Sequence, residues 1–174
     1  MNPAGSKELP VIIDIEASGF GAGSYPIEVG YFMPDGQMYC TLIRPEPGWT
    51  HWHASAEAVH GVSRQTLLDK GRPADEVARR LNADLRGRTV YCDAWAHDFP
   101  WLHTLYDAVD QVPTFALKDL RQLLGDCEQS LWQATRAAVE LRLQLRRHRA
   151  SGDARTLFET LNETRKRCAP DWSA

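Results

Sequence analysis

The sequence predicts a single α/β domain, in which three antiparallel strands are followed by alternating helices and strands. The chain has 174 residues, 43% of them hydrophobic and 25% charged, which suits one globular domain with a full core. Residues 11–44 contain three strand-like apolar segments separated by turn residues. Strand and helix patterns alternate between residues 73 and 125, and such alternation indicates parallel strand pairing.

The first strand ends at a pair of carboxylates. Three branched apolar residues at positions 11–13 run directly into Asp14, and Glu16 follows two residues later. Because strand side chains alternate between faces, Asp14 and Glu16 point to one face, whereas Ile13 and Ile15 point to the other. Two carboxylates held this close repel each other unless a cation lies between them, and Mg²⁺ prefers oxygen ligands. We interpret the segment as a metal-binding strand end, although a strand with one polar side facing solvent also has this D-x-E pattern.

The next two strands complete an antiparallel meander. The glycine-rich stretch at residues 19–26 lacks the Lys-Ser/Thr ending of a phosphate-binding loop and therefore predicts a turn. Residues 25–33 and 37–44 have strand patterns, and Asp35-Gly36 between them is a strong hairpin signal. In the loop that follows, at residues 45–55, two histidines offer zinc ligands, but no cysteine or carboxylate lies nearby at ligand spacing. Aromatic packing of this loop is the favoured interpretation.

Helix signals dominate the middle of the chain. Ser63 is a candidate N-cap for a short helix through Leu68, and Pro73 opens a longer helix that Gly87 closes. The apolar stripe of the longer helix consists of Val77, Leu81 and Leu85.

A strand, a helix and a mixed segment come next. Residues 88–93 predict a short strand, residues 98–109 a helix, and residues 115–125 a brief strand or loop followed by another helix. The stripe of the helix at residues 98–109 consists of Leu102, Leu105, Tyr106 and Val109.

Two helices are expected at the end of the chain. Residues 128–147 predict a long amphipathic helix, residues 148–153 a polar turn, and residues 153–167 the last helix. The apolar face of the first of these helices is expected to be Leu131, Ala134, Ala138, Leu141 and Leu145. The face of the last helix is expected to be Leu157, Phe158, Leu161 and Thr164.

Composition sets further expectations about organisation and location. We expect a flexible tail at residues 1–9, one domain at residues 10–168 and a short tail at residues 169–174. No apolar run approaches the length of a membrane span, and the N-terminus lacks the apolar core of a secretory signal. The prediction is therefore a cytoplasmic protein without a membrane partner.

Cysteine spacing and charge are also informative. The net charge of −3 argues against bulk binding of nucleic acid, yet residues 142–167 carry eight Arg or Lys against three carboxylates. No C-x-x-C spacing is present, so reduced thiols are expected at Cys40, Cys92, Cys127 and Cys168.

Two further carboxylates occur where a helix is expected to begin after a strand or turn. They are Asp98 in DFPWL and Asp153 in HRASGD. Strand ends and helix N-termini meet on one rim of an α/β sheet, which is where such folds place their sites. We therefore expect Asp98 and Asp153 to converge with Asp14 and Glu16.

The ordered set of motifs resembles the DEDDh, or DnaQ-like, family of 3′→5′ exonucleases. DIEASGF resembles the first family motif, DFPWL the second and HRASGDA the third, while AVHGV resembles its H-G-[IV] element. The resemblance covers residues 11–167. It implies a ribonuclease-H-like α/β fold, with a mixed five-stranded sheet whose first three strands are antiparallel and with helices on both faces.

The resemblance also implies a chemistry and roles for named residues. The expected activity is metal-dependent 3′→5′ exonucleolysis of single-stranded nucleic acid, releasing nucleoside 5′-monophosphates. Two divalent cations, Mg²⁺ or Mn²⁺, would be held by Asp14, Glu16, Asp98 and Asp153. His148 would act as general base, since an imidazole with a pKa of about 6.5 is mostly neutral at physiological pH. A helix-terminal cation is the structural alternative for His148, and an inactive module that binds nucleic acid or a protein partner is the functional one.

Substrate contacts follow from the same resemblance. The expected substrate-binding residues are Ser18, Gly19, Phe20, His60, Asp93 and Arg149. Phe20 suits either stacking on a base or core packing, and His60 suits either a substrate contact or a turn. The basic residues Arg146, Arg147 and Arg149 suit either phosphate binding or a solvated helix end. Two departures from the family pattern concern substrate positioning: Asp93 stands where relatives often carry asparagine, and Ala17 replaces a threonine.

The identity of the substrate stays open at this level. The expected partner is single-stranded nucleic acid or a short oligonucleotide, either RNA or DNA, because no motif specifies contacts to a 2′-hydroxyl. Substrate length and oligomeric state are equally open, and a homodimer is among the arrangements allowed.

Overall fold

The computed structural model describes residues 9–145 and 147–169. The predicted tails therefore fall outside the described residues, except for Leu9 and Ala169 at their inner ends. Within the described ranges no helix has the length and apolar content required to cross a membrane.

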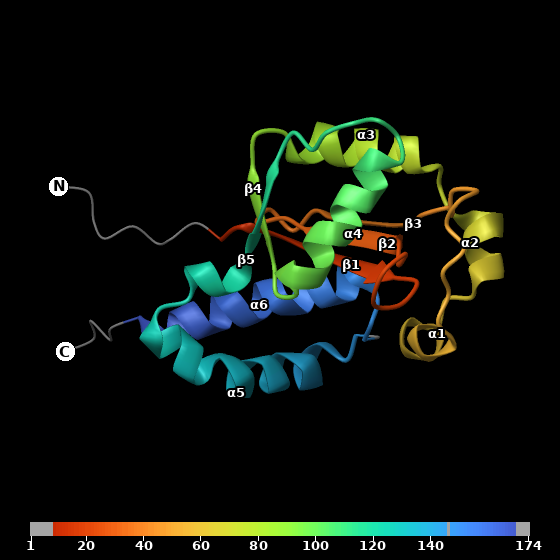
Figure 1. Cartoon of the computed structure of the whole chain (residues 1–174). Coiled ribbons are helices and arrows are strands. Elements are labelled where there is room, and N and C mark those ends of the chain that lie inside the picture. Colours follow the sequence, from red (N-terminus) through yellow and green to blue (C-terminus); the bar gives the residue numbers. More distant parts are fainter. Residues whose placement is uncertain (1–8, 146, 170–174) are drawn as a thin grey trace, which may run out of the picture.

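Among the described residues, a five-stranded sheet with the order β3-β2-β1-β4-β5 forms the centre of the fold (Figure 1). β1 pairs antiparallel with β2, and β2 pairs antiparallel with β3, so the predicted meander is confirmed. β4 pairs parallel with both β1 and β5, as the alternation of strands and helices predicted. The strands are β1 (Val11–Ala17), β2 (Pro26–Phe32), β3 (Met38–Leu42), β4 (Thr89–Cys92) and β5 (Ala116–Asp119).

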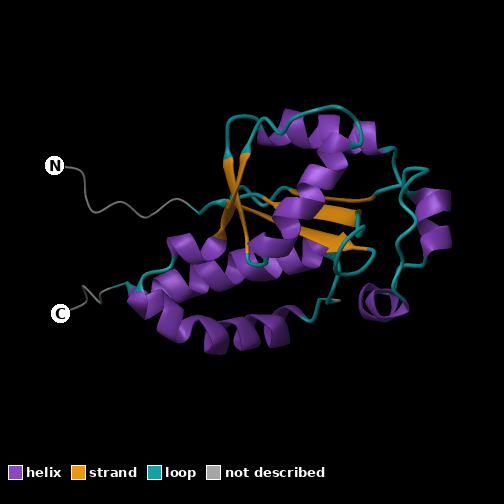
Figure 2. Cartoon of the chain, viewed as in Figure 1, coloured by secondary structure: helices purple, strands orange, loops and turns teal. Residues whose placement is uncertain are grey.

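Helices cover both faces of this sheet (Figure 2). α3 and α4 pack on one face and α6 on the other, with α5 packed along α6. A 3-10 helix at Leu120–Leu123 takes the place of the helix expected after β5. The α-helices are α1 (Ala54–His60), α2 (Arg64–Lys70), α3 (Ala74–Leu85), α4 (Trp95–Asp107), α5 (Asp126–Leu143) and α6 (Ala150–Cys168).

Side-chain alternation along β1 assigns its residues to the two halves of the core. Ile13 and Ile15 are buried in the cluster with the α3 and α4 side chains. Ile12 lies in the other cluster, where it packs with Leu157 and Leu161 of α6. Asp14 shares the parity of Ile12 and therefore faces the side of the sheet that α6 covers. The predicted faces of β1 and of the last helix are confirmed.

The face of α5 that packs on α6 differs from the predicted one. The buried residues of α5 are Trp132, Thr135 and Val139, whereas Leu141 is 75% exposed. The helix also ends at Leu143 instead of continuing to residue 147. Hydrophobic periodicity alone predicted the wrong stripe, because the single large Trp132 anchors the contact and small alanines do not need burial.

The predicted polar turn at residues 148–153 is partly helical. α6 begins at Ala150, so Asp153 lies in its first turn and not before it. The close approach of β2 supports this start, since a Cβ added to Gly30 would lie 2.4 Å from the backbone nitrogen of Ser151. A glycine at this position of β2 lets the first turn of α6 rest directly on the sheet.

The expectation of reduced thiols is wrong for two of the four cysteines. Cys127, in the first turn of α5, forms a disulfide with Cys168 at the end of α6. The two helices pack side by side, so residues 41 positions apart in sequence have Cα atoms 6.0 Å apart. Cys40 and Cys92 are free. Sequence spacing did not reveal this pairing because helix packing creates it.

Candidate active site

The first two site residues come from the C-terminal half of β1. Asp14 and Glu16 pair in register with Gly30 and Glu28 of β2. Asp14 lies buried between the sheet and α6. The neighbouring carboxylates surround it there with negative charge. Because Asp14 and Glu16 are two residues apart on one strand, both side chains open into the same hollow, as predicted.

The third carboxylate comes from the first turns of α4. Asp98 follows β4, which is parallel to β1, so the ends of both strands meet at one edge of the sheet. Its side chain is 1% exposed, and its Oδ2 atom has no hydrogen-bond partner among the described residues. A buried carboxylate oxygen without a partner is costly, so the site requires either a proton or a cation at this oxygen.

The remaining two residues come from α6 and the segment before it. Asp153 accepts a hydrogen bond from the backbone N–H of His148 at 2.9 Å. His148 adopts a left-handed backbone conformation with a φ of 57°, and this turn directs its ring to the site. One ligand atom each of Glu16, His148 and Asp153 lies within 4.8 Å of the others. The structure therefore brings together all five residues that the motifs singled out.

Burial and mutual repulsion make these carboxyl groups weak acids. Burial, followed by the charges of Asp98 and Glu16, raises the pKa of Asp14 well above its usual value. Burial, followed by the charge of Asp153, raises the pKa of Glu16 to about 7. Burial, with a contribution from Asp93, raises the pKa of Asp98 to about 8.

This donor set fits hard divalent cations. It offers carboxylate oxygens from Asp14, Glu16, Asp98 and Asp153, which Mg²⁺ and Mn²⁺ prefer over sulfur or nitrogen ligands. The partnerless oxygen of Asp98 and the raised pKa values are what a cluster of carboxylates shows when its counter-charge is absent. The residues present therefore match the predicted metal ligands in chemistry and in mutual proximity.

The first prediction concerns stability and pH. Without metal, the thermal unfolding midpoint is expected to fall as pH rises from about 5 to about 8. The folded state binds protons more tightly than the unfolded chain, because the folded pKa values of Glu16 and Asp98 are about 7 and about 8. Stability from these groups is fully present below their unfolded pKa values of about 4 and is lost as pH passes the folded values.

Millimolar Mg²⁺ or Mn²⁺ is expected to reverse this loss, with a larger increase in the midpoint at pH 8 than at pH 5, since cations compete with protons for the same oxygens. Differential scanning fluorimetry across pH, with metal and with chelator, measures both effects. A midpoint that responds to neither pH nor metal would contradict the interpretation of this cluster.

A second, more apolar hollow adjoins the acidic one. The acidic hollow has a volume of about 220 Å³, and the apolar hollow of about 300 Å³ lies beside it. The two share Glu16, Phe20, Trp101 and His148. A molecule bound in the apolar hollow would therefore lie directly against the carboxylates.

Phe20 is a surface residue at the rim of both hollows. Its side chain is 65% exposed, so the core-packing alternative is wrong. Its ring centroid lies 5.1 Å from that of His97 and 5.9 Å from that of Trp101, both on α4. The sequence reasoning missed His97 and Trp101, although their positions beside Asp98 on one helix were a usable signal.

Ser18 and Gly19 have structural roles in this site. Ser18 is fully buried, and its hydroxyl accepts a hydrogen bond from the backbone N–H of Tyr25. The predicted substrate contact of the Ser18 side chain is therefore not supported by its position. Gly19 borders the apolar hollow, where its φ of 153° and the rings of His51 and His53 leave no space for a side chain. Those two rings stack 4.6 Å apart, as the aromatic-packing interpretation of the loop expected.

His60 combines both interpretations given to it. Its ring is buried, and its Nδ1 accepts a hydrogen bond from the backbone N–H of Val62, as a turn residue does. The residue also lines the apolar hollow, and its Nε2 has no hydrogen-bond partner among the described residues. Burial lowers its pKa, which favours the neutral form of the ring.

Arg149, which was expected to bind substrate, has a structural partner in this structure. Its guanidinium forms a bidentate ion pair with Glu28, at 2.6 and 3.0 Å, and Glu28 is 1% exposed. Glu28 also accepts the backbone N–H of Ala150 at 2.9 Å, so this pair fixes the start of α6 to β2. Arg147 is exposed and lines the acidic hollow, whereas Arg146 lies outside the described residues.

Asp93 lines the acidic hollow but not the apolar one, and its carboxylate is paired. Its carboxylate accepts a hydrogen bond from Arg136 of α5 at 2.8 Å. Sequence reasoning missed Arg136, and no sequence signal could have found it, because only the packing of α5 brings it within reach of Asp93. The pair closes one wall of the acidic hollow.

This arrangement of strands and helices matches the fold of solved exonuclease structures. The chain resembles the nuclease domain of 3′hExo, a DEDDh family member bound to rAMP, with a TM-score of 0.67, 14% identity, and coverage of 95% of this chain and 96% of that one. It also resembles exonuclease I from Methylocaldum szegediense, with a TM-score of 0.67, 15% identity, and coverage of 91% and 40%. No family model and no curated protein sequence matches the chain.

A third similar structure is the zinc-bound complex of Escherichia coli exonuclease I with single-stranded DNA. The TM-score is 0.66 at 12% identity, with coverage of 91% of this chain and 40% of that one. The chain thus spans about 40% of the length of the exonuclease I structures that it matches. At these identities the similarity establishes the fold.

Proposed function

We propose that the protein is a metal-dependent 3′→5′ exonuclease that releases nucleoside 5′-monophosphates from single-stranded nucleic acid. The observation that carries this proposal is the convergence of four carboxylates and one imidazole at the edge of an apolar hollow. The apolar hollow has room for part of a nucleoside, and the carboxylates lie beside the position that its attached phosphate would occupy. The fold shared with exonuclease structures supports the same class of reaction.

Asp14, Glu16, Asp98 and Asp153 would hold two divalent cations, Mg²⁺ or Mn²⁺. Bound cations would neutralise charge on the phosphate and favour ionisation of the attacking water. The chain itself supplies the positioning of these ligands: β1 fixes two of them, α4 the third and α6 the fourth. Each rigid element limits ligand movement, which favours a defined coordination geometry.

His148 would accept the proton of the attacking water. Its ring lies at the mouth of the acidic hollow, close to Glu16 and Asp153. The hydrogen bond from its backbone N–H to Asp153 leaves the imidazole free for proton transfer and fixes the turn that carries it. Phe20 and Trp101 would contact the terminal base, because both rings border the apolar hollow.

The second prediction tests the polarity of the proposed reaction. A single-stranded oligonucleotide with a 3′-hydroxyl is expected to be shortened stepwise from that end, and a 3′-phosphate is expected to block digestion. The reason is that the terminal nucleoside must enter the apolar hollow of about 300 Å³, which has room for only part of a nucleoside and therefore none for an added 3′-phosphate. A 5′-phosphate should have no effect.

Gel analysis of 5′-labelled and 3′-labelled RNA and DNA, with Mg²⁺, Mn²⁺ or chelator, measures this polarity and any preference between the two nucleic acids. Equal digestion of 3′-hydroxyl and 3′-phosphate substrates, or cleavage of a circular single strand, would exclude the proposal. Binding without hydrolysis under every metal condition would instead favour a non-catalytic nucleic-acid-binding module.

A further inference from the structure

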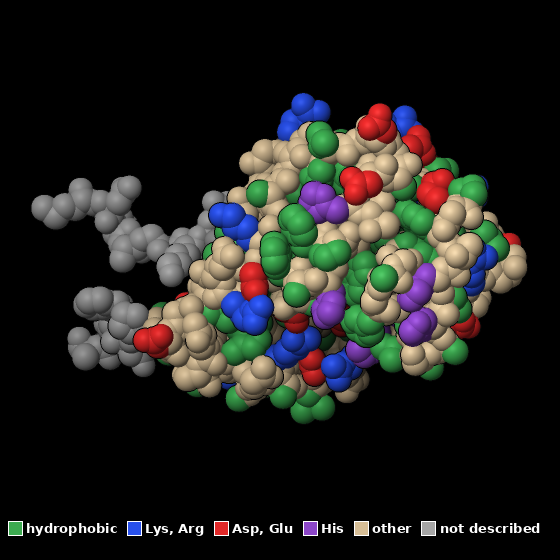
Figure 3. Space-filling model, viewed as in Figure 1, with side chains coloured by type: hydrophobic (Ala, Val, Ile, Leu, Met, Phe, Trp, Pro, Cys, Tyr) green, Lys and Arg blue, Asp and Glu red, His purple; other side chains and the backbone are tan. Residues whose placement is uncertain are grey.

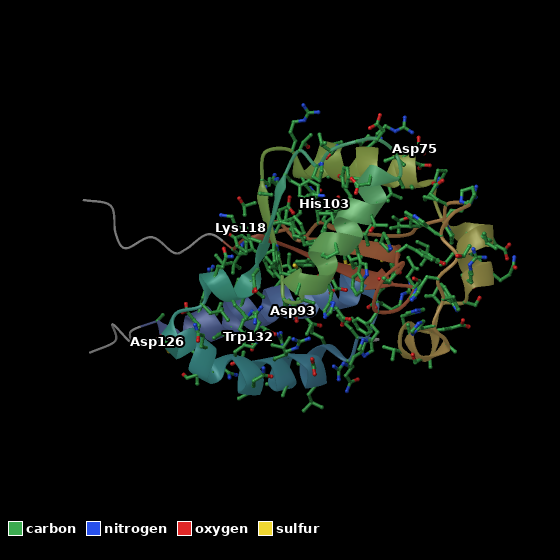
Figure 4. The ribbon with its side chains drawn as sticks, in the orientation of Figure 1. Asp75, Asp93, His103, Lys118, Asp126 and Trp132 are labelled. Atoms are coloured by element: carbon green, nitrogen blue, oxygen red, sulfur yellow. A yellow bond between two sulfur atoms is a disulfide. The ribbon has the colours of Figure 1, made fainter. Side chains whose placement is uncertain are left out.

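A row of aromatic side chains follows α4 outside the acidic hollow. Trp95, Phe99 and His103 occupy every fourth position, with ring centroids 4.9 Å apart for the first pair and 4.3 Å apart for the second. Trp95 is 38% exposed, and its indole N–H donates a hydrogen bond to the carbonyl of Leu117 in β5 at 3.2 Å. Figure 3 shows hydrophobic surface over this helix, and Figure 4 labels His103 on it. We call these three residues the α4 aromatic row.

The α4 aromatic row lies on the flank of the helix opposite the rings of the hollow. An α-helix turns about 100° per residue, so Trp95 and Phe99 lie on one side of the buried Asp98 face. His97 and Trp101, which line the acidic hollow, lie on the other side. The helix that supplies Asp98 therefore presents aromatic rings on two flanks. The terminal nucleotide of the proposed substrate would contact only the flank that carries His97 and Trp101.

The two adjoining hollows suggest how a bound single strand would be oriented, with its terminal nucleoside in the apolar hollow and the rest of the strand beyond the acidic one. A terminal nucleoside in the apolar hollow places its phosphate against the carboxylates. The rest of the strand then leaves across the wall away from the apolar hollow, which Asp93, Ala94 and Arg136 form. Trp95 is the next residue along the chain, and Figure 4 shows Asp93 at the foot of α4. The first ring of the α4 aromatic row therefore follows directly after Ala94, a residue that lines the acidic hollow.

The chemistry of the row suits unpaired bases. Aromatic rings at a surface bind bases of any sequence by stacking, because every base has a π-face. In this row Trp95 is exposed, and Phe99 and His103 are half-buried. Lys118, which is exposed on the neighbouring strand β5, supplies a positive charge on the same side of the molecule (Figure 4). From Trp95 to His103 the helix rises about 12 Å, which is enough for a few nucleotides at a spacing of about 3.4 Å.

We propose that the α4 aromatic row is a stacking platform for the bases of the single strand upstream of the terminal nucleotide. This inference rests on the proposed exonuclease function and adds to it. It predicts a dependence on substrate length, because a dinucleotide occupies only the two hollows, which none of the three residues of the row lines, whereas a 12-mer extends beyond them.

The test compares a dinucleotide with a single-stranded 12-mer of the same base. The variants are Trp95→Ala and Phe99→Ala, with Trp95→Phe as the conservative replacement and Leu141→Ala as control, since Leu141 is exposed on α5. kcat/KM for the 12-mer is expected to fall about fivefold or more in both alanine variants and to stay near wild type in the other two. Hydrolysis of the dinucleotide should change less than about twofold. Circular dichroism verifies folding, and fluorescence anisotropy with the labelled 12-mer in chelator measures binding without catalysis.

Equal losses for both substrates, or unchanged 12-mer binding in the alanine variants, would overturn the stacking platform and leave the exonuclease proposal intact. If the wild-type protein hydrolyses neither substrate, the proposed function fails. The anisotropy measurement then still shows whether the α4 aromatic row binds single-stranded nucleic acid. Equal affinity of wild type and Trp95→Ala for the 12-mer would then exclude a role in nucleic-acid binding and leave a protein partner as the occupant of this surface.

Discussion

Asp14→Asn is expected to lower the rate of hydrolysis by at least about 10³-fold, because ligand loss at a catalytic metal site removes several kcal/mol of transition-state stabilisation. Asp14 is the proposed ligand that the other carboxylates surround: burial raises its pKa most, and Asp98, Glu16 and Asp153 raise it further. An amide keeps the shape of the side chain and removes its charge. The fold is therefore expected to remain intact.

The same substitution should stabilise the metal-free protein at pH 8. The raised pKa of Asp14 means that its ionised form is disfavoured in the folded state, and Asn eliminates that cost. Initial rates on a 3′-hydroxyl oligomer and thermal midpoints with chelator measure the two effects. Asp69→Asn is a suitable control, since Asp69 is an exposed carboxylate on α2. Near-normal activity of Asp14→Asn together with a native circular dichroism spectrum would show that the site is assigned wrongly.

His148→Asn is expected to reduce the rate about 10²- to 10⁴-fold, the usual contribution of a general base. Asparagine is preferred over alanine because residue 148 has a φ of 57°, and asparagine tolerates this left-handed conformation better. The backbone N–H that binds Asp153 stays in place, so the proposed ligands should be unaffected. Raising the pH should restore part of the rate, because hydroxide from solvent replaces the missing base.

Asp153→Asn supplies the contrast for this experiment. It removes charge from the proposed ligand set, so a higher metal concentration should recover part of its activity, whereas His148→Asn should not respond. Rates for both variants across a metal series and a pH series, on one short oligomer, separate the two roles. If metal alone restores His148→Asn, or if this variant loses less than about tenfold at neutral pH, general-base catalysis by His148 is untenable.

The sequence by itself determined the features that depend on local order and periodicity. Alternation along β1 put Asp14 and Glu16 on one face, and the structure confirms that both open into one hollow. Ser63 was identified as an N-cap, and its hydroxyl accepts the Thr66 N–H in the structure. The family resemblance carried by the motifs implied the five-stranded sheet. The convergence of the carboxylates was expected because parallel strand ends and helix starts meet at one edge.

Tertiary packing decided what no local pattern encodes. The disulfide between Cys127 and Cys168 exists because α5 and α6 lie side by side, and Arg136 reaches Asp93 for the same reason. Arg149 looked like a phosphate ligand in the sequence, yet Glu28, 121 residues earlier in the chain, binds its guanidinium. Contacts between distant segments depend on how whole elements pack, and hydrophobic periodicity specifies which residues are buried without specifying their partners.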